Sequence, residues 1–212
     1  MKGIKSTIMT GAITLASILP IKSNALDGFL KYVQPIDDPS GSYVEVDAFY
    51  GLPGKVNGFT WAYAYRGGEG YFGETNLERE VTNGFNVNSQ MQHCNTPINR
   101  AGFGISRQVP LPTDKVFLKA SALPIFFDET GIQKNSADLG YFISAELPHG
   151  FRIESFGDWN LADKNGPQWG YGEISVSREA VKGVRLMYDP SLLNKGNAVP
   201  EVQHRAGITL NF

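Results

Sequence analysis

The chain lacks a second cysteine, a long apolar run beyond its first residues, and any concentration of positive charge. Cys94 stands alone, so no intrachain disulfide can form. Lys and Arg number 19 against 21 Asp and Glu, without a basic run or basic helix, which argues against a nucleic-acid partner. Beyond residue 25 no segment of about 20 residues is apolar throughout, and this excludes a membrane protein built from helices.

Residues 1–25 have the composition of a secretory signal peptide. Lys2 and Lys5 give a positive start, an apolar stretch runs from Ile8 to Ile21, and the small residues of 23–25 form a cleavage site. The apolar stretch is shorter than the ~20 residues that a membrane span needs, which makes an uncleaved anchor the weaker alternative. We therefore expect cleavage before Leu26.

The end of the chain predicts a β-strand. Ala206, Ile208, Leu210 and Phe212 are apolar and lie two residues apart, with polar residues or glycine between them. A period of two places the two sets on opposite faces of a strand.

The rest of the chain divides into similar alternating segments, separated by Gly, Pro, Asn and Asp, which favour turns. None of them keeps a helical period over a full helix length. The ten segments that we expect to form strands are 42–51, 57–66, 70–82, 98–109, 116–123, 139–147, 151–160, 169–178, 184–189 and 202–212.

The connections between these segments alternate in length. Residues 67–69 and 148–150 are tight turns, whereas 83–97, 124–138 and 190–201 are long. Bacterial outer-membrane barrels have short periplasmic turns and longer external loops. We therefore expect an all-β fold, a closed antiparallel up-and-down transmembrane β-barrel at 42–212, with 26–41 as a periplasmic lead-in. Ten strands are favoured, and eight or twelve result if segments merge or are missed. On this count 52–56 is external and 67–69 is periplasmic.

In most segments the period of two separates a charged face from an apolar one. A Lys or Arg that faces lipid at mid-membrane costs ~2–4 kcal/mol, and several would exceed a folding free energy of ~5–15 kcal/mol. The charged faces should therefore line the interior, and the aromatic face of 57–66 (Phe59, Trp61, Tyr63 and Tyr65) should meet lipid. The expected lumen charges are Glu45, Asp47, Arg66, Glu74, Glu78, Arg100, Lys119, Glu146, Arg152, Glu154, Asp158, Arg185, Asp189 and Arg205.

With its leader, alternating segments and final strand, the chain resembles small bacterial outer-membrane β-barrel proteins, although no specific family follows. Ala206, Ile208, Leu210 and Phe212 resemble the C-terminal insertion signal of that class, which ends in an aromatic residue. The resemblance implies residence in a Gram-negative outer membrane, contact with outer-membrane lipid and lipopolysaccharide, and insertion by the barrel-assembly machinery.

The function expected from these features is a structural element or a narrow passive channel with a charged, largely filled lumen, because barrels of eight to ten strands are narrow. One alternative is a surface-binding protein that acts through its long external loops. Another is a membrane-embedded hydrolase that uses Asp158, Asp189 and His93. A soluble periplasmic barrel that holds a lipid is also open. The sequence predicts no cofactor and no metal, because the zinc-binding His pattern and the Gly-x-Ser-x-Gly elbow are missing. It leaves the oligomeric state open.

Overall fold

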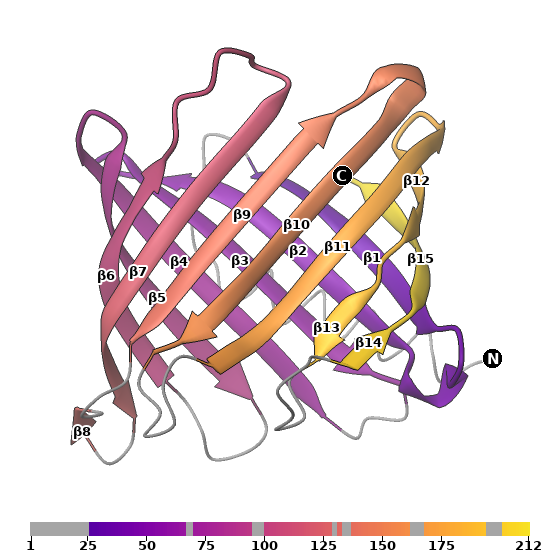
Figure 1. Ribbon diagram of the computed structural model, residues 1–212, viewed down its shortest axis with the longest axis horizontal. Helices are drawn as coiled ribbons and strands as arrows, with labels where there is room; N and C mark the ends of the chain where they lie inside the picture. The colour runs from indigo at the N-terminus through magenta and orange to yellow at the C-terminus, as the bar shows by residue number, and fades with distance from the viewer. Residues whose placement is uncertain are drawn as a thin grey trace.

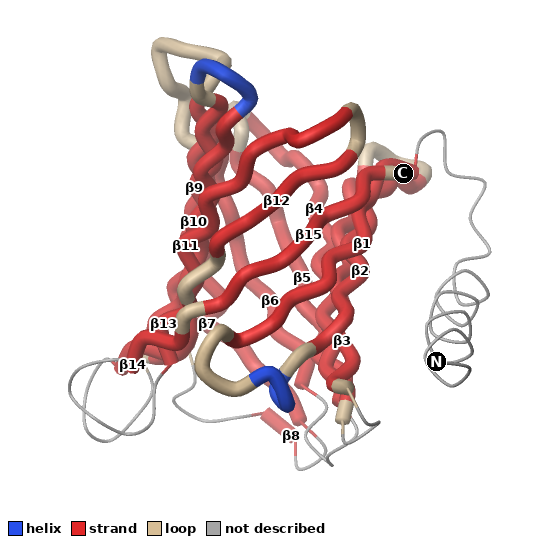
Figure 2. Tube along the Cα trace, turned by 90° about the vertical axis from the view of Figure 1, so that its right-hand side faces the viewer, coloured by secondary structure: helices blue, strands red, loops and turns tan. Residues whose placement is uncertain are grey.

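The computed structural model describes residues 26–66, 70–94, 100–128, 131–132, 137–161, 168–193 and 201–212. Its strands form one closed antiparallel barrel, seen from the side in Figure 1 and turned by 90° in Figure 2. Within the described residues twelve strands make up the ring. The all-β, up-and-down barrel expected from the sequence is therefore confirmed, but the favoured count of ten strands is wrong.

The strands of the ring run in chain order around the barrel. Their bounds are β1 (Leu26–Pro35), β2 (Tyr43–Leu52), β3 (Val56–Tyr65), β4 (Tyr71–Thr82), β5 (Phe85–Cys94), β6 (Arg100–Gln108), β7 (Val116–Asp128), β9 (Asp138–Glu146), β10 (Phe151–Asn160), β11 (Gln168–Val181), β12 (Val184–Tyr188) and β15 (Arg205–Asn211). The short elements are β8 (Gly131–Ile132), β13 (Ser191–Leu193), β14 (Glu201–Gln203) and the 3₁₀ turns η1 (Pro39–Gly41) and η2 (Pro148–Gly150).

The barrel closes where its first strand meets its last. β1 pairs with β2 on one side and with β15 on the other, so that Leu30 lies opposite both Val46 and Leu210. β15 in turn pairs with β12, and β12 with β11. Beyond β12, β13 continues the pairing with β11, and β14 pairs with β13. Every wall strand thus has two neighbours, and no edge is left to expose unpaired backbone groups.

The two strands that the sequence interpretation missed are β1 and β5. Residues 26–41 were expected to be a periplasmic lead-in, but 26–35 form a wall strand. β5 lies inside 83–97, which we expected to be one long loop. Its turn from β4 is Asn83-Gly84, with φ of 46° and 75°. Both residues are left-handed, which is the geometry of a tight two-residue hairpin.

The extra strands change which connections share an end of the barrel. The short connections 53–55, 83–84, 147–150 and 182–183 lie at one end, together with the paired ends of β1 and β15, where Gly28 and Phe212 exchange backbone hydrogen bonds. We call this the short-turn end. Since β1 precedes β2, the connection 53–55 lies at this end, and the facing ends of β3 and β4 at Tyr65 and Tyr71 lie at the opposite end, which reverses our expectation. After β5 the expected alternation is restored.

Exposure of the side chains follows the inside-out pattern of a membrane barrel. On β15 the apolar Ile208 is 43% exposed, whereas Arg205 is 3% exposed, and on β2 Asp47 is 2% exposed. A soluble sandwich turns its apolar side chains inward instead. Among the described residues, the structure contains no helix of the length and apolarity that a membrane crossing requires.

A bulge in β11 keeps this pattern in phase. Between β10 and β11 the register steps from Gly157–Gly172 to Trp159–Trp169, so β11 carries one extra residue at Gly170–Tyr171. The bulge explains why, in the sequence, Trp169 and Tyr171 are out of phase with the apolar residues after them. The bulge leaves Glu173 buried on the interior face.

Candidate functional site in the barrel interior

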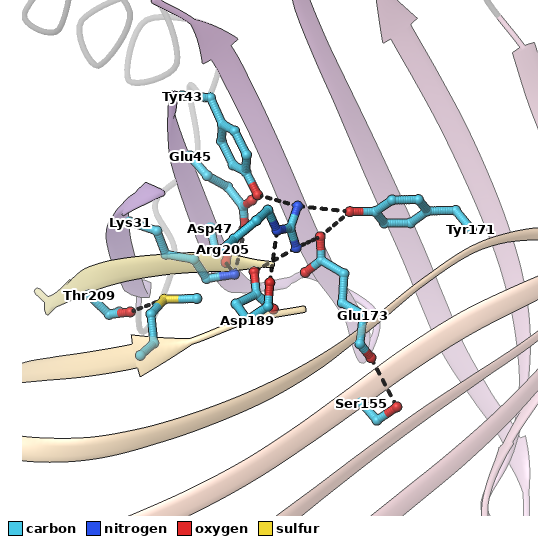
Figure 3. Close-up of polar contacts among 11 residues, drawn as sticks. Lys31, Tyr43, Glu45, Asp47, Ser155, Tyr171, Glu173, Asp189, Arg205 and Thr209 are labelled. Carbon is cyan, nitrogen blue, oxygen red and sulfur yellow. Dashed lines mark hydrogen bonds and ion pairs between the residues drawn. The ribbon is translucent and has the colours of Figure 1, made fainter. Parts of the chain in front are cut away.

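The most buried polar group in the interior is a cluster around Arg205, shown in Figure 3. Its Nη2 lies 2.5 Å from Oε1 of Glu173 on β11 and 2.6 Å from Oδ2 of Asp189, the residue after β12. Its Nε donates to the carbonyl oxygen of Asp189 at 2.9 Å, and its Nη1 donates to the hydroxyls of Tyr43 at 2.8 Å and Tyr171 at 3.2 Å. One guanidinium therefore joins β2, β11 and β15.

Lys31 on β1 extends this cluster. Its Nζ lies 2.5 Å from Oε1 of Glu45 and 2.9 Å from Oδ2 of Asp47, both on β2. We call these residues together the seam network, because they lie where the first and last strands close the barrel (Figure 3). The seam network consists of Lys31, Tyr43, Glu45, Asp47, Tyr171, Glu173, Asp189 and Arg205. Buried charges are tolerated only where they are paired and hydrogen-bonded.

Further ion pairs cross the interior away from the seam network. Lys119 on β7 pairs with Glu78 on β4, which also accepts a hydrogen bond of 2.9 Å from Ser106 on β6. Arg100 on β6 lies 3.9 Å from Asp138 on β9. Since other wall strands lie between the partners of each pair, these side chains must point inward and meet inside the barrel.

The interior face also contains the remaining expected charges, with one exception. Glu74, Glu146, Arg152, Glu154, Asp158 and Arg185 lie in register with interior residues of neighbouring strands. Arg152 contacts Glu146 at 2.9 Å and Glu154 at 3.6 Å. Arg66 does not share this face: it follows β3, is exposed, and has the parity of the outward-facing Ala62 and Ala64.

Acids outnumber bases among the described interior residues. The acids are Asp27, Glu45, Asp47, Glu74, Glu78, Glu80, Asp138, Glu146, Glu154, Asp158, Glu173, Glu179 and Asp189, and the bases are Lys31, Arg100, Lys119, Arg152, Arg185 and Arg205. Lys31, Arg152 and Arg205 are each shared between two carboxylates. The interior therefore carries an excess of negative charge.

Sequence reasoning missed Lys31, Asp138 and Glu173, and each was missed for a local reason. Lys31 lies in the segment that was taken for a lead-in. Asp138 immediately precedes an expected strand, and Glu173 follows the bulge that shifts the phase of β11. A search for alternation with one permitted bulge would have placed Glu173 on the charged face.

The aromatic face of β3 points inward, which corrects the expectation that it meets lipid. Trp61 lies opposite Asp47 on β2 and Glu74 on β4, and Tyr63 lies opposite Glu45. Directly opposed residues share a face of the sheet. Because these acids are interior, the rings are interior as well.

The rings of this inner face form two groups, Phe49 with Phe59 and Trp61 with Tyr63 and Phe72, which together we call the aromatic stripe. Phe49 and Phe59 stack with ring centroids 4.6 Å apart, and Trp61 lies 5.8 Å from Tyr63 and 5.2 Å from Phe72. Phe49 is 44% exposed although it faces inward. The interior is therefore accessible to solvent beside the stripe, in contrast to the seam network.

The outer face carries the C-terminal residues that resemble an insertion signal. Ala206, Ile208, Leu210 and Phe212 all alternate with the interior residues of β15 and are exposed. His204, just before them, is exposed, and its Nδ1 forms a 2.5 Å hydrogen bond with the hydroxyl of Tyr188. His93 lies opposite Gly73 on the outer face, far from the interior acids named with it for a hydrolase.

The comparisons with known proteins support the barrel architecture. No protein-family model and no curated protein matches the chain. Among solved structures, the KdgM porin matches with a TM-score of 0.57 at 9% identity, covering 88% of this chain and 99% of that chain. The NanC porin matches with a TM-score of 0.56 at 11% identity, covering 89% and 100%. The outer membrane phospholipase of Salmonella typhi, a dimer with bound calcium, matches with 0.50 at 11%, covering 93% and 96%. At these identities the likeness shows the fold alone.

Proposed function

We propose that this protein is an integral outer-membrane β-barrel that acts as a narrow passive channel. Outer-membrane lipid and lipopolysaccharide would surround it, and the barrel-assembly machinery would insert it by its C-terminal strand. The observation that carries the proposal is the inside-out barrel: apolar side chains such as Ile208 cover the outside, and paired charges such as those of Arg205 lie within.

Three outward-facing arginines support a membrane boundary near the short-turn end. Arg79 lies opposite Val56, Arg107 opposite Phe85 and Arg178 opposite Phe151, and each of these partners adjoins a short turn. Arg107 also lies 4.4 Å from the centre of the Phe85 ring. Long basic side chains beside aromatic rings are typical of the headgroup level, where the charge reaches water while the stem stays in the apolar layer.

The strand number supports a passage rather than a filled plug. With strands about 4.8 Å apart and tilted by about 40°, each added strand widens a barrel by about 2 Å. Side chains are just able to fill eight-stranded barrels, whereas porins of sixteen or more strands enclose a wide aqueous channel. Twelve strands fall between these limits. The seam network occupies part of the interior, and the solvent-accessible side of the aromatic stripe is left for passage.

The fold likeness to the KdgM and NanC porins agrees with a channel. The expected alternatives, surface binding through the long connections and hydrolysis in the membrane, gain no comparable support from the described contacts. In particular, His93 lies on the outer face, whereas Asp158 and Asp189, the acids named with it, lie on the inner face.

The proposal is tested by fractionation and by conductance. The full-length protein should co-purify with the outer membrane and migrate differently on gels before and after heating. Refolded in planar lipid bilayers, it should give small current steps. Recovery as a water-soluble monomer would contradict the membrane assignment. The absence of current steps at high protein concentration would contradict the channel.

A further inference from the structure

The aromatic stripe has a surrounding that distinguishes it from the other rings of the barrel. Trp61 has a carboxylate beside it on each neighbouring strand, Asp47 on β2 and Glu74 on β4. Glu74 accepts hydrogen bonds from the amides of Asn76 at 2.7 Å and Gln92 at 3.1 Å. Asp47 keeps one buried oxygen, Oδ1, without a hydrogen-bond partner among the described residues. Glu74 therefore keeps lone pairs available next to the rings, whereas Asp47 is buried and paired with Lys31 and adds only its negative charge.

The protein's own cations cover ring faces on the seam side but leave the stripe free. Lys31 lies 5.1 Å from the ring centre of Phe29, and Arg205 lies 5.7 Å from that of Tyr43. Over the five rings of the stripe, no Lys or Arg of the described residues is positioned in this way. Although some of these rings stack on one another, no cation of the described residues lies over any of them.

Aromatic faces and nearby carboxylates together favour a positively charged ligand. A ring attracts a cation over its face, and this attraction is the usual means by which proteins recognise quaternary ammonium groups. An acidic lining of low dielectric constant concentrates cations and repels anions. We propose that the aromatic stripe, together with Glu74, binds small organic cations that carry an ammonium group as they enter the barrel. The proposal rests on the proposed channel for access, but the binding itself does not require conduction.

The same reasoning predicts that this lumen prefers a different kind of ligand from the one bound to a structural neighbour. The KdgM porin has been solved in complex with disordered oligogalacturonate, a chain of sugar acids. Here five of the six described interior bases are already paired with carboxylates, namely Lys31, Arg100, Lys119, Arg152 and Arg205. We therefore expect the channel to disfavour galacturonate.

Binding is measured first without any current, on the full chain refolded in detergent. Of its three tryptophans, Trp159 and Trp169 are changed to Phe, so that Trp61 alone reports. Choline should change the emission of Trp61 in a saturable manner. Its uncharged carbon isostere, neohexyl alcohol, should bind about 2- to 30-fold more weakly, because it lacks the cation–π attraction. Galacturonate should have no effect.

Variants then test whether the stripe is the site. Tyr63→Leu and Phe59→Leu should weaken choline binding by the same factor of about 2 to 30, and Glu74→Gln by about 2- to 5-fold. Phe117→Leu is the matched control, because Phe117 is an interior ring on β7 that contacts Phe142 instead of the stripe. Equal binding of choline and neohexyl alcohol, or equal losses in the control and the stripe variants, would overturn the proposal.

A conductance measurement separates this proposal from the proposed channel. In a KCl gradient across a planar bilayer, the reversal potential should favour K⁺, and choline should reduce the current in wild type more than in Tyr63→Leu. A preference for Cl⁻ would overturn the proposal while leaving the channel intact. If no current is seen in the bilayer but choline binds normally, the channel would be overturned while the cation site stays intact.

Discussion

The seam network and the aromatic stripe line the same interior but are built in opposite ways. Around Arg205 and Asp189, which is 1% exposed, every charge is buried and held by a partner of the opposite sign. In the stripe, Phe49 stacks on Phe59 and Trp61 stacks on Tyr63, and Phe49 is exposed to solvent. The difference indicates that the network serves barrel closure, because it joins β1, β2, β11 and β15, whereas the stripe is available for a passing solute.

The largest effect should come from removing the central cation of the network. Arg205→Met leaves Glu173 and Asp189 buried without compensation, and we expect the folded barrel to lose about 3–5 kcal/mol. Urea unfolding in detergent, followed by the heat-modifiable gel band, measures the loss. Arg107→Met on the outer face, where the side chain is exposed, is the control and should cost less than about 1 kcal/mol. Equal midpoints for the two variants would remove the network's special role.

The next effect tests whether the network truly lies on the inner side of β15. Ile208 alternates with Arg205 and Thr209 along this strand. Ile208→Lys should cost about 2–4 kcal/mol, because it places a charge in the lipid layer. Thr209→Ser is the conservative partner on the inner face. If the Ile208→Lys variant were as stable in lipid as wild type, our assignment of the inner and outer faces would be reversed.

A smaller loss is expected at the edge of the network. Tyr43→Phe removes the hydroxyl that accepts from Nη1 of Arg205 at 2.8 Å. A buried charged donor that loses one acceptor costs about 1–3 kcal/mol, unless Tyr171 or water compensates. The midpoint of urea unfolding should fall between those of wild type and Arg205→Met. A midpoint at or below that of Arg205→Met would show that the hydroxyl, not the guanidinium, is central.

The smallest stability effect should occur in the stripe. Trp61→Leu removes a partly exposed ring, so we expect a loss of less than about 1.5 kcal/mol, with larger current steps in planar bilayers because the interior gains volume. Phe117→Leu again serves as the control for the loss of an interior ring. A loss of stability as large as that of Arg205→Met would abolish the distinction between the two regions.

The barrel could be predicted from the sequence because both of its signals can be read within a single strand. These signals are the alternation of apolar and polar residues and the free-energy cost of a charge that faces lipid. The prediction failed at β1, where Lys31 and Val33 share the inner face, so that the charged and apolar sets do not separate. β5 was missed although its signal is present: Phe85, Val87 and Met91 alternate with amides after an Asn-Gly turn. Amide side chains suggested a loop, but inside a polar lumen they belong to a strand.

The candidate site was less predictable, because it depends on register between strands. Within β3 both faces are uncharged, one aromatic and the other made of Thr, Ala and Gly. Burial preference alone places the rings toward lipid. Only the pairing of Trp61 with Asp47 and Glu74 places them inside, and that pairing is a property of three strands together.

The position of Arg205 at the start of β15 has a consequence for biogenesis. Until this strand pairs with β12, the carboxylates of Glu173 and Asp189 have no guanidinium between them and repel each other. A barrel that lacks its last strand is thereby penalised by its own electrostatics, and this penalty disappears when that strand is added. The ionic contact therefore acts as a latch that distinguishes completed molecules from arrested ones.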